Sequence, residues 1–196
     1  MNRPTSIAGA SRRRRAKDVA PATWLVRLTT SPLHYWCSFV SDSMVVVLFL
    51  AFGGRGARPF EIIAALGVGT AIYTLSEYGF HRWLYHATRV HSLHALHHAD
   101  PRAPVGAPFF FTLALAASAF WLACRVVAAP VAAVFAGAFL GTHVYQGVVH
   151  HALHQGWGGA FRVLRRHHHL HHRRGDTNFG VSTIFWDRIF RTHTRD

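Results

Sequence analysis

Histidine stands out in this 196-residue chain, because its 17 copies outnumber the eight carboxylates. Ten of these histidines have ligand-like spacing: His81, His86, His94, His97, His98, His150, His154, His168, His171 and His172. Two triads with spacing i, i+3, i+4 begin at His94 and at His168, and this spacing places each triad on one face of a helix. His81 and His86 are five residues apart and are expected to diverge, as ligands to two different ions would.

The clustered imidazoles indicate a metal site. Neutral imidazole is a suitable ligand for iron, zinc, copper or nickel, whereas protonated rings repel one another. Ten ring nitrogens would serve two metal ions with five ligands each. A hydrolytic zinc site normally needs only three protein ligands. The chain also lacks the Glu-x-x-His pattern of ferritin-like di-iron bundles and the His-Glu-x-x-His pattern of zinc proteases.

The other seven histidines are expected to be structural or surface residues: His34, His91, His143, His151, His167, His169 and His193. His143 is also a candidate for a supporting role near the metal, because ionisable groups inside membrane spans are often functional.

Four apolar stretches must position the histidines, at residues 33–52, 60–79, 108–129 and 130–149. Each has about 20 residues, which is enough to cross a hydrocarbon core of roughly 30 Å. Two of the stretches separate the two histidine blocks, so both blocks lie on the same side of the membrane. The sequence therefore predicts an all-α integral membrane protein with about four transmembrane helices and a histidine-rich helical cap.

The formal net charge of +13 orients the chain. A cytoplasmic N-terminus places most cations on the inner side, as the positive-inside rule requires. Residues 1–31, which include Arg12–Arg15, are expected to form a basic cytoplasmic tail, and residues 32–196 a single membrane domain. The composition favours a bacterial inner membrane, with both termini and the histidines in the cytoplasm. Cations spread along one face without a recognisable nucleic-acid module argue against nucleic-acid binding, and two cysteines exclude a disulfide scaffold.

With these residues in view, the chain resembles the fatty acid hydroxylase/sterol desaturase superfamily of membrane-bound di-iron oxygenases. The family pattern His-x4-His, His-x2-His-His, His-x3-His, His-x2-His-His is met in order by the ten histidines, and Asn178–Phe190 is similar to the family's closing segment. The short gap between His86 and His94 resembles the sterol desaturase and carotenoid hydroxylase branches. His151 remains an alternative to His150, and the run 167–169 leaves the start of the last motif open, although spacing favours His168.

Two carboxylates close to the histidine motifs are expected to support the metal ligands. Glu77 lies one helical turn before His81 and is expected to orient that ring. Asp187 is expected to act in the same way, or to cap a helix or pair with a nearby arginine.

The resemblance implies two iron ions, O₂ and two electrons, used to hydroxylate or desaturate a lipid such as an acyl chain, a sterol or an isoprenoid. Imidazole also accepts zinc, so zinc is an alternative metal in purified protein. No flavin or nicotinamide motif occurs, so an external donor, such as a ferredoxin or a cytochrome b5-like protein, is expected on the basic inner face. The alternatives are a carotenoid ring hydroxylase and a non-catalytic membrane metal-binding or transport protein.

Overall fold

The computed structural model describes residues 30–86, 91–102, 106–156 and 159–195, and every regular element in these ranges is helical. The elements are α3 (Pro32–Gly56), α4 (Pro59–Gly79), η1 (Phe80–Tyr85), α5 (His91–Ala99), α6 (Phe109–Ala123), α7 (Ala129–Gln155), η2 (Gly159–Phe161), α8 (Arg162–Arg174) and α9 (Phe185–Ile189). The all-α prediction is confirmed. The predicted basic tail falls almost wholly on residues 1–29, outside the described residues, so it stays a prediction.

Three helices are long and apolar enough to cross a membrane: α3, α4 continued through η1 to Tyr85, and α7. The fourth expected span is shorter than predicted, because α6 covers only the 15 residues Phe109–Ala123. A helix of that length extends about 22 Å, less than the roughly 30 Å of the hydrocarbon core. The four-span prediction is therefore corrected to three full-length helices and one shorter apolar helix.

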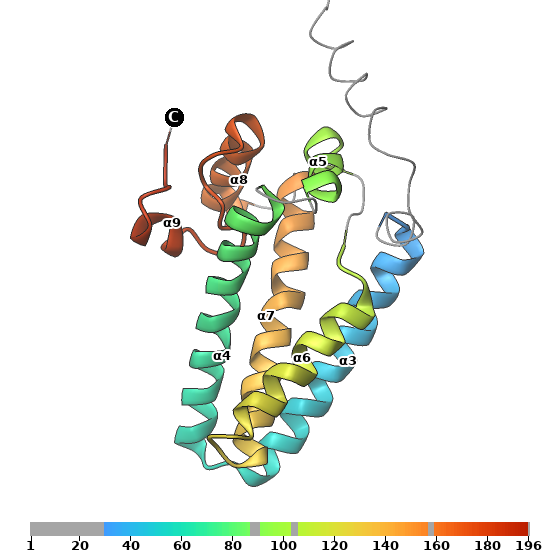
Figure 1. The fold of residues 1–196 in the computed structure, drawn as a ribbon, viewed down its shortest axis with the longest axis vertical. Helices are drawn as coiled ribbons and strands as arrows, with labels where there is room; N and C mark the ends of the chain where they lie inside the picture. The colour runs from blue at the N-terminus through green and yellow to red at the C-terminus, as the bar shows by residue number, and fades with distance from the viewer. Residues whose placement is uncertain (1–29, 87–90, 103–105, 157–158, 196) are drawn as a thin grey trace, which may run out of the picture.

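α7 is the central helix of the bundle, and α3, α4 and α6 all pack against it (Figure 1). Half of its apolar window is buried inside the protein, against 17% for α3 and α4. The outer helices instead expose large apolar side chains such as Val47, Leu48 and Ile63. Such exposed apolar surface is unusual on a soluble protein and suits contact with lipid. Both histidine blocks lie at one end of this bundle, around α5 and α8 (Figure 1).

Helix boundaries follow local signals in the sequence. Pro32, Pro59 and Pro130 occupy the first turns of α3, α4 and α7, where the missing N–H costs nothing. α7 and α8 end at Gly156 and Gly175, whose φ angles of +76° and +80° favour glycine. These two stops place the histidines of α7 and α8 in the last turns of their helices, at the same end of the bundle.

Glycines allow the outer helices to approach α7 closely. A Cβ on Gly53 of α3 would lie 2.6 Å from the carbonyl oxygen of Pro130, and one on Gly69 of α4 would lie 2.6 Å from that of Phe135. Small residues at such contacts let helix backbones pack tightly in a membrane. Because α4 leads into η1, this contact also sets the position of the first histidine motif.

We expect Gly69→Val to destabilise the bundle, because the new side chain meets the backbone of α7 rather than a flexible side chain. Overpacking of this kind costs about 1–3 kcal/mol. The matched control is Gly67→Val in the same helix, where a Cβ would meet nothing within 4 Å. The measurement is the thermal unfolding midpoint of both variants in detergent. Equal shifts in the two variants would show that the close approach of α4 to α7 does not matter.

Candidate metal centre

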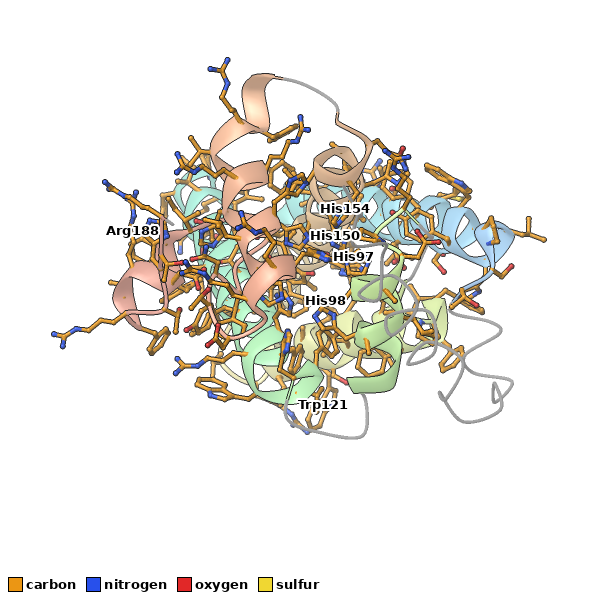
Figure 2. The ribbon with its side chains drawn as sticks, turned by 90° about the horizontal axis from the view of Figure 1, so that it is seen from above. His97, His98, Trp121, His150, His154 and Arg188 are labelled. Atoms are coloured by element: carbon orange, nitrogen blue, oxygen red, sulfur yellow. The ribbon has the colours of Figure 1, made fainter. Side chains whose placement is uncertain are left out.

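The structure brings the ten predicted histidines together in two groups of five, and the ligand atoms of each group all lie within 4.8 Å of one another. The first group contains His81, His86, His94, His98 and His171. The second group contains His97, His150, His154, His168 and His172. Both groups combine residues from the two sequence blocks. Seen from above, the labelled members His97, His98, His150 and His154 lie near the middle of the molecule (Figure 2).

A π-helix explains why His81 and His86 share one group. The sequence analysis expected these rings to diverge, because five residues of α-helix do not return to the same face. Phe80–Tyr85 is π-helical, however, and its i→i+5 pattern brings residues five apart close together. Their ring centroids are 5.3 Å apart. The expectation of two different ions for this pair is therefore corrected.

The two triads, by contrast, are divided between the groups. In α5, His94 and His98 belong to the first group and His97 to the second. In α8, His171 belongs to the first group, and the other two triad members belong to the second. Consecutive side chains on a helix point about 100° apart, so one helix placed between two centres serves both. α5 and α8 therefore hold the two groups side by side.

The distances between ring nitrogens fit ligands around a common cation. Nε2 of His94 lies 3.0 Å from Nε2 of His81, 3.0 Å from that of His86 and 2.9 Å from that of His98. Two nitrogens bound at right angles to one ion, each at about 2.1 Å, would be about 3.0 Å apart. A single ring nitrogen cannot hydrogen-bond to three others at once, so a shared cation is the better account of this convergence.

The second group has the same geometry around His168. Its Nε2 lies 2.9 Å from Nε2 of His154, 3.0 Å from that of His172 and 3.1 Å from that of His150. His97 completes the group, with its Nε2 2.9 Å from that of His150. The donor set, five buried or half-buried imidazoles without a carboxylate, suits iron or zinc.

These rings are held in the neutral form that binds metal. Burial, assisted by repulsion from neighbouring rings, lowers the pKa of His97 to about 3. Burial likewise lowers the pKa of His171 to about 3, and it lowers the pKa values of His94, His168 and His172 well below the ordinary range. Neutral imidazoles keep a lone pair at physiological pH, so a metal does not have to displace a proton.

Two backbone carbonyl groups orient rings of the first group. Nδ1 of His171 donates to the carbonyl oxygen of Thr177 at 2.8 Å, and Nδ1 of His81 donates to that of Phe179. These contacts place the ring proton on Nδ1 and leave Nε2 available for a metal. In the second group, Nδ1 of His168 and of His172 has no hydrogen-bond partner among the described residues.

Glu77 anchors the loop that carries these carbonyls, rather than His81 itself. Its carboxylate accepts hydrogen bonds from the backbone N–H of Val181 at 2.6 Å and of Ser182 at 3.1 Å, and from the Ser182 hydroxyl. The predicted direct contact with the His81 ring is therefore corrected, since the partner of that ring is Phe179. Glu77 acts on the ring indirectly, by holding the loop.

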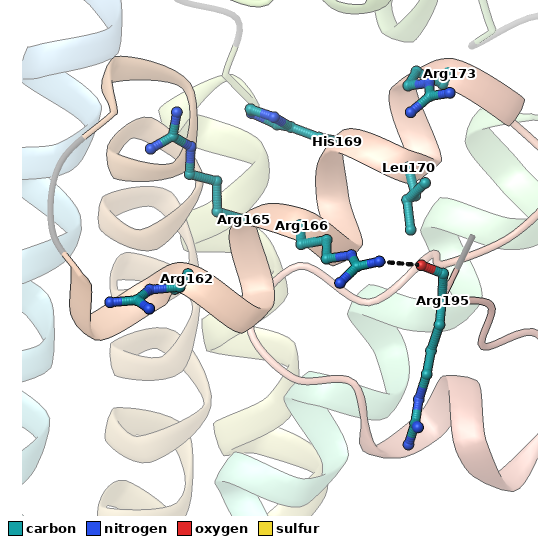
Figure 3. Close-up of a pocket in the computed structure, with 7 residues that line it drawn as sticks. All are labelled: Arg162, Arg165, Arg166, His169, Leu170, Arg173 and Arg195. Carbon is teal, nitrogen blue, oxygen red and sulfur yellow. Dashed lines mark hydrogen bonds between the residues drawn. The ribbon is translucent and has the colours of Figure 1, made fainter.

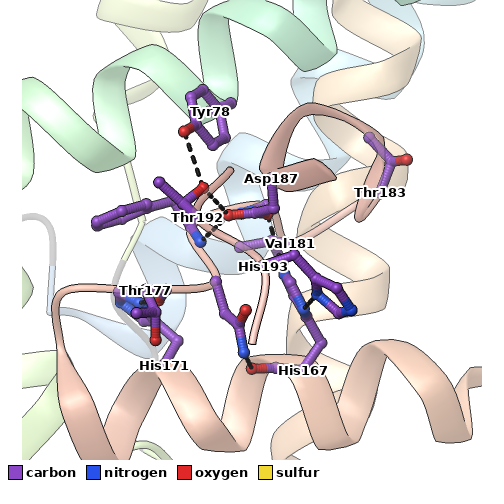
Figure 4. Close-up of polar contacts among 12 residues, drawn as sticks. Tyr78, His167, His171, Thr177, Val181, Thr183, Asp187, Thr192 and His193 are labelled. Atoms are coloured by element: carbon purple, nitrogen blue, oxygen red, sulfur yellow. Dashed lines mark hydrogen bonds and ion pairs between the residues drawn. The ribbon is translucent and has the colours of Figure 1, made fainter. Parts of the chain in front are cut away.

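Asp187 anchors the other side of the same loop and is fully buried (Figure 4). It accepts hydrogen bonds from the N–H groups of Phe179 and Gly180, both at 2.8 Å, and from the Thr192 hydroxyl at 2.7 Å. His167 lies 3.0 Å away through Nε2. Burial raises the pKa of the Asp187 carboxyl, but these donors outweigh it and the net pKa is lowered, so the group is ionised.

Sequence reasoning missed Asn178, which closes this network. Its backbone has a φ of +59°, and its side-chain amide donates to the carbonyl oxygens of His167 and Thr194 at 3.3 and 3.2 Å. Asparagine tolerates this left-handed conformation better than most residues. The only sequence signal for it is its place at the start of the family-like closing segment.

The structure also separates the alternatives within the histidine runs. His151 belongs to neither group, and its ring lies against those of Tyr35 and Trp36, with centroid distances of 6.3 and 5.8 Å. His167 bonds to Asp187, and His169 is exposed. Of the open alternatives, only His150 and His168 belong to the second group.

His143 belongs to a separate polar cluster inside the bundle and contacts neither group. Its Nδ1 lies 2.8 Å from the hydroxyl of Tyr73, and its Nε2 lies 3.8 Å from the carboxylate of Asp42. The hydroxyl of Thr112 donates to that carboxylate at 2.9 Å. Helices α3, α4, α6 and α7 each contribute one of these residues. The predicted role of His143 beside the metal ligands is therefore corrected to one in helix packing.

We expect His143→Phe to lower stability modestly and to leave the metal content per chain unchanged. Hydrogen bonds between membrane helices are worth about 0.6 kcal/mol on average, and at most about 1.7 kcal/mol. Metal analysis together with the unfolding midpoint measures both effects. Loss of one metal ion per chain would contradict the packing role.

The fatty acid hydroxylase family model matches residues 66–192, which contain both histidine groups and the anchoring loop. The chain belongs to this family. The superfamily resemblance predicted from the histidine motifs is thus confirmed, and membership makes the chain an oxidoreductase of the hydroxylase kind.

Named relatives of this fatty acid hydroxylase chain come from plants, yeast and mammals. It is 29% identical over 86% of its length to "Dihydroceramide fatty acyl 2-hydroxylase FAH1" of Arabidopsis thaliana, of which it covers 72%. It is 34% identical over 81% of its length to "Ceramide very long chain fatty acid hydroxylase SCS7" of Saccharomyces cerevisiae, but it spans only 45% of that protein. These relatives are fatty acid hydroxylases, so the sterol desaturase or carotenoid hydroxylase branch suggested by the short histidine gap is not supported.

A solved structure has the same fold. The hydroxylase domain visible in full-length scs7p matches with a TM-score of 0.76 and 26% sequence identity, over 88% of this chain and 70% of that one. The all-helical membrane architecture is therefore shared with a fatty acid hydroxylase domain.

Proposed function

We propose that this chain is a membrane-bound di-iron hydroxylase that inserts one oxygen atom from O₂ into the fatty acyl chain of a ceramide-like lipid. The observation that carries the proposal is the pair of five-imidazole groups at one end of an apolar helix bundle. The acyl specificity is taken from the named relatives, which are dihydroceramide and ceramide fatty acid hydroxylases. The acyl C–H bond becomes C–OH. The second oxygen atom takes up two electrons from the donor and two protons and leaves as water.

The two groups of five histidines would each hold one iron ion. Iron supplies the one-electron chemistry that O₂ activation needs and that no side chain in the site can supply. The protein's own part is to keep the rings neutral and to fix their orientation. The loop carrying Phe179 and Thr177 performs the second task, held from both sides by Glu77 and Asp187.

The lipid would approach from the bilayer, because the histidine groups lie where the apolar helices end. Electrons would come from a separate one-electron donor, such as a ferredoxin or a cytochrome b5-like protein. By the positive-inside rule this end, with the arginines of α8, would lie in the cytoplasm. A bacterial inner membrane, with both termini cytoplasmic, stays a prediction from composition.

The test is mass spectrometry of lipids from a ceramide-producing host that expresses the chain, beside a His97→Ala/His98→Ala variant that removes one member of each group. We expect acyl chains heavier by one oxygen only with the unaltered protein, and one label per product under ¹⁸O₂. Identical lipid profiles would overturn the proposal.

The same host supplied with carotenoid precursors tests the carotenoid alternative, because a hydroxylated carotenoid without hydroxylated acyl chains would replace the proposal. Metal movement across liposomes, without O₂ consumption in the presence of a reductant, would instead indicate a transport protein. Metal analysis of protein grown on iron, and of the same protein exchanged with zinc, separates the working metal from a substitute.

A further inference from the structure

The outer face of α8 carries cations opposite the metal ligands. Positions i, i+3, i+4, i+7 and i+11 from Arg162 are all exposed, and they are Arg162, Arg165, Arg166, His169 and Arg173. With Arg195 they line a hollow of about 540 Å³, to which no described carboxylate contributes (Figure 3). We call these six residues the arginine face. The inward face of the same helix carries His168, His171 and His172.

This arrangement is unfavourable for the helix itself. Like charges three or four residues apart destabilise a helix, as Arg162 does with Arg165 and Arg166. Arginine in the first turn also opposes the helix dipole, which favours acidic residues there. Arg166 donates to the carbonyl oxygen of Arg195 at 3.0 Å. An exposed surface of one charge is complementary to an acidic partner and would speed its association.

His169 connects the arginine face to the second histidine group. Its exposed ring stacks against that of His154, with centroids 6.2 Å apart and planes 21° apart. Nε2 of His154 lies 2.9 Å from Nε2 of His168. Two ring contacts therefore lead from the surface to the centre of the second group. No comparable chain is needed to bind an anionic membrane surface, where the arginines alone would suffice.

We propose that the arginine face is the docking surface of the acidic one-electron carrier protein that reduces the metal centre, and that electrons enter at the second histidine group through His169 and His154. This inference rests on the proposed function and names the surface that its electron donor uses. Two reduced carriers would each dock and deliver one electron, and each carrier would leave oxidised. The arginines provide attraction, and His169 is a positioning residue for the transfer.

The test uses the full chain, with metal bound, in nanodiscs of neutral phosphatidylcholine. The probes are two acidic carriers, a soluble cytochrome b5 and a plant-type [2Fe–2S] ferredoxin. Arg165→Glu/Arg173→Glu reverses two charges of the arginine face. Arg55→Glu/Arg125→Glu makes the same charge change in exposed residues and is the matched control. Arg55 is in the last turn of α3 and Arg125 follows the end of α6, and both of these helix ends lie at the opposite end of the bundle from α8 (Figure 1). Carrier binding and the rate of carrier oxidation are measured against salt concentration.

We expect the variant of the arginine face to weaken binding and to slow carrier oxidation about tenfold or more at low salt for at least one carrier, with a flatter salt dependence. The matched control should behave like the unaltered protein. His169→Leu, which removes none of the arginine charges, should change the carrier Kd far less than the charge reversal does and should lower the maximal transfer rate. Equal effects of the two charge reversals, or no effect of either, would overturn the proposal.

Two further measurements distinguish a failure of this proposal from a failure of the proposed function. Product formation with a small chemical reductant should be the same in the variant of the arginine face and in the unaltered protein, which shows an intact metal centre. If that reductant yields no product even with the unaltered protein, the proposed function fails, while carrier binding still tests the surface. If the charge reversal weakens binding to phosphatidylglycerol vesicles but not to either carrier, the arginine face binds the membrane and the proposal is wrong.

Discussion

Replacing His150 by alanine is expected to remove one metal ion per chain and to abolish hydroxylated product. His150 contributes Nε2 to the second group, 2.9 Å from that of His97 and 3.1 Å from that of His168. Loss of a residue that hydrogen-bonds to a metal ligand typically lowers metal affinity or activity about 10- to 100-fold. Loss of the ligand itself should lower both further. Metal content by mass spectrometry and product formation per chain measure the two effects.

His151→Ala is the matched control, because His151 is the next residue in α7 and its ring lies against Tyr35 and Trp36. This variant should keep both metal ions and form product at a rate within about twofold of the unaltered protein, since surface-type substitutions away from special features have small effects. If His151→Ala loses metal and His150→Ala keeps it, the assignment of the third motif is reversed.

Asp187→Asn is expected to have the second large effect, although the histidine partner of Asp187, His167, belongs to neither group of five. The carboxylate is fully buried and accepts from Phe179, Gly180 and Thr192. The side-chain amide of an asparagine would direct its N–H groups at the backbone and hydroxyl donors that now bond to the carboxylate. Breaking such a buried, charged hydrogen-bond network lowers the free energy of unfolding by about 3 kcal/mol or more. The freed loop would no longer fix the carbonyl group that orients His81. We expect a lower unfolding midpoint and metal binding weakened about 10- to 100-fold.

Asp100→Asn is the matched control for charge, because Asp100 is exposed and accepts only from the nearby Arg102 N–H at 3.3 Å among its described contacts. It should change neither the unfolding midpoint nor the metal affinity. Folding lowers the pKa of Asp187, so its contribution to the stability of the folded protein is fully present above the ordinary pKa of a carboxyl group. That contribution is lost as the pH falls through the lowered pKa. Unchanged metal binding in Asp187→Asn would show that the loop does not need this anchor.

The gathering of the ten histidines could be predicted from the sequence because helical spacing and membrane topology are both local properties. Triads at i, i+3, i+4 and two apolar stretches between the blocks were enough to collect ten rings at one end of the bundle. The division of these rings into groups could not be predicted. It depends on η1 being π-helical and on where α5 and α8 lie between the two centres.

The partners of the two supporting carboxylates also could not be predicted from the sequence. Glu77 and Asp187 were identified as candidates, but the partner of Glu77 was wrongly predicted as His81. Its actual partners, Val181 and Ser182, are 104 and 105 residues away along the chain. Asn178 carried no signal of its own. Contacts over such separations are set by how the closing segment folds back onto α4, which no local pattern contains.

By itself, the sequence determined the helical membrane class, the family and which ten histidines come together. Periodicity, the length of apolar stretches and motif spacing are local features that can be read directly from the order of residues. Only the tertiary structure decided which five rings face each centre, that His143 packs helices, and that one loop orients His81 and His171. The physical reason is that a ring's partner depends on the direction of its side chain and on elements far away in sequence, and both are settled only when the helices pack.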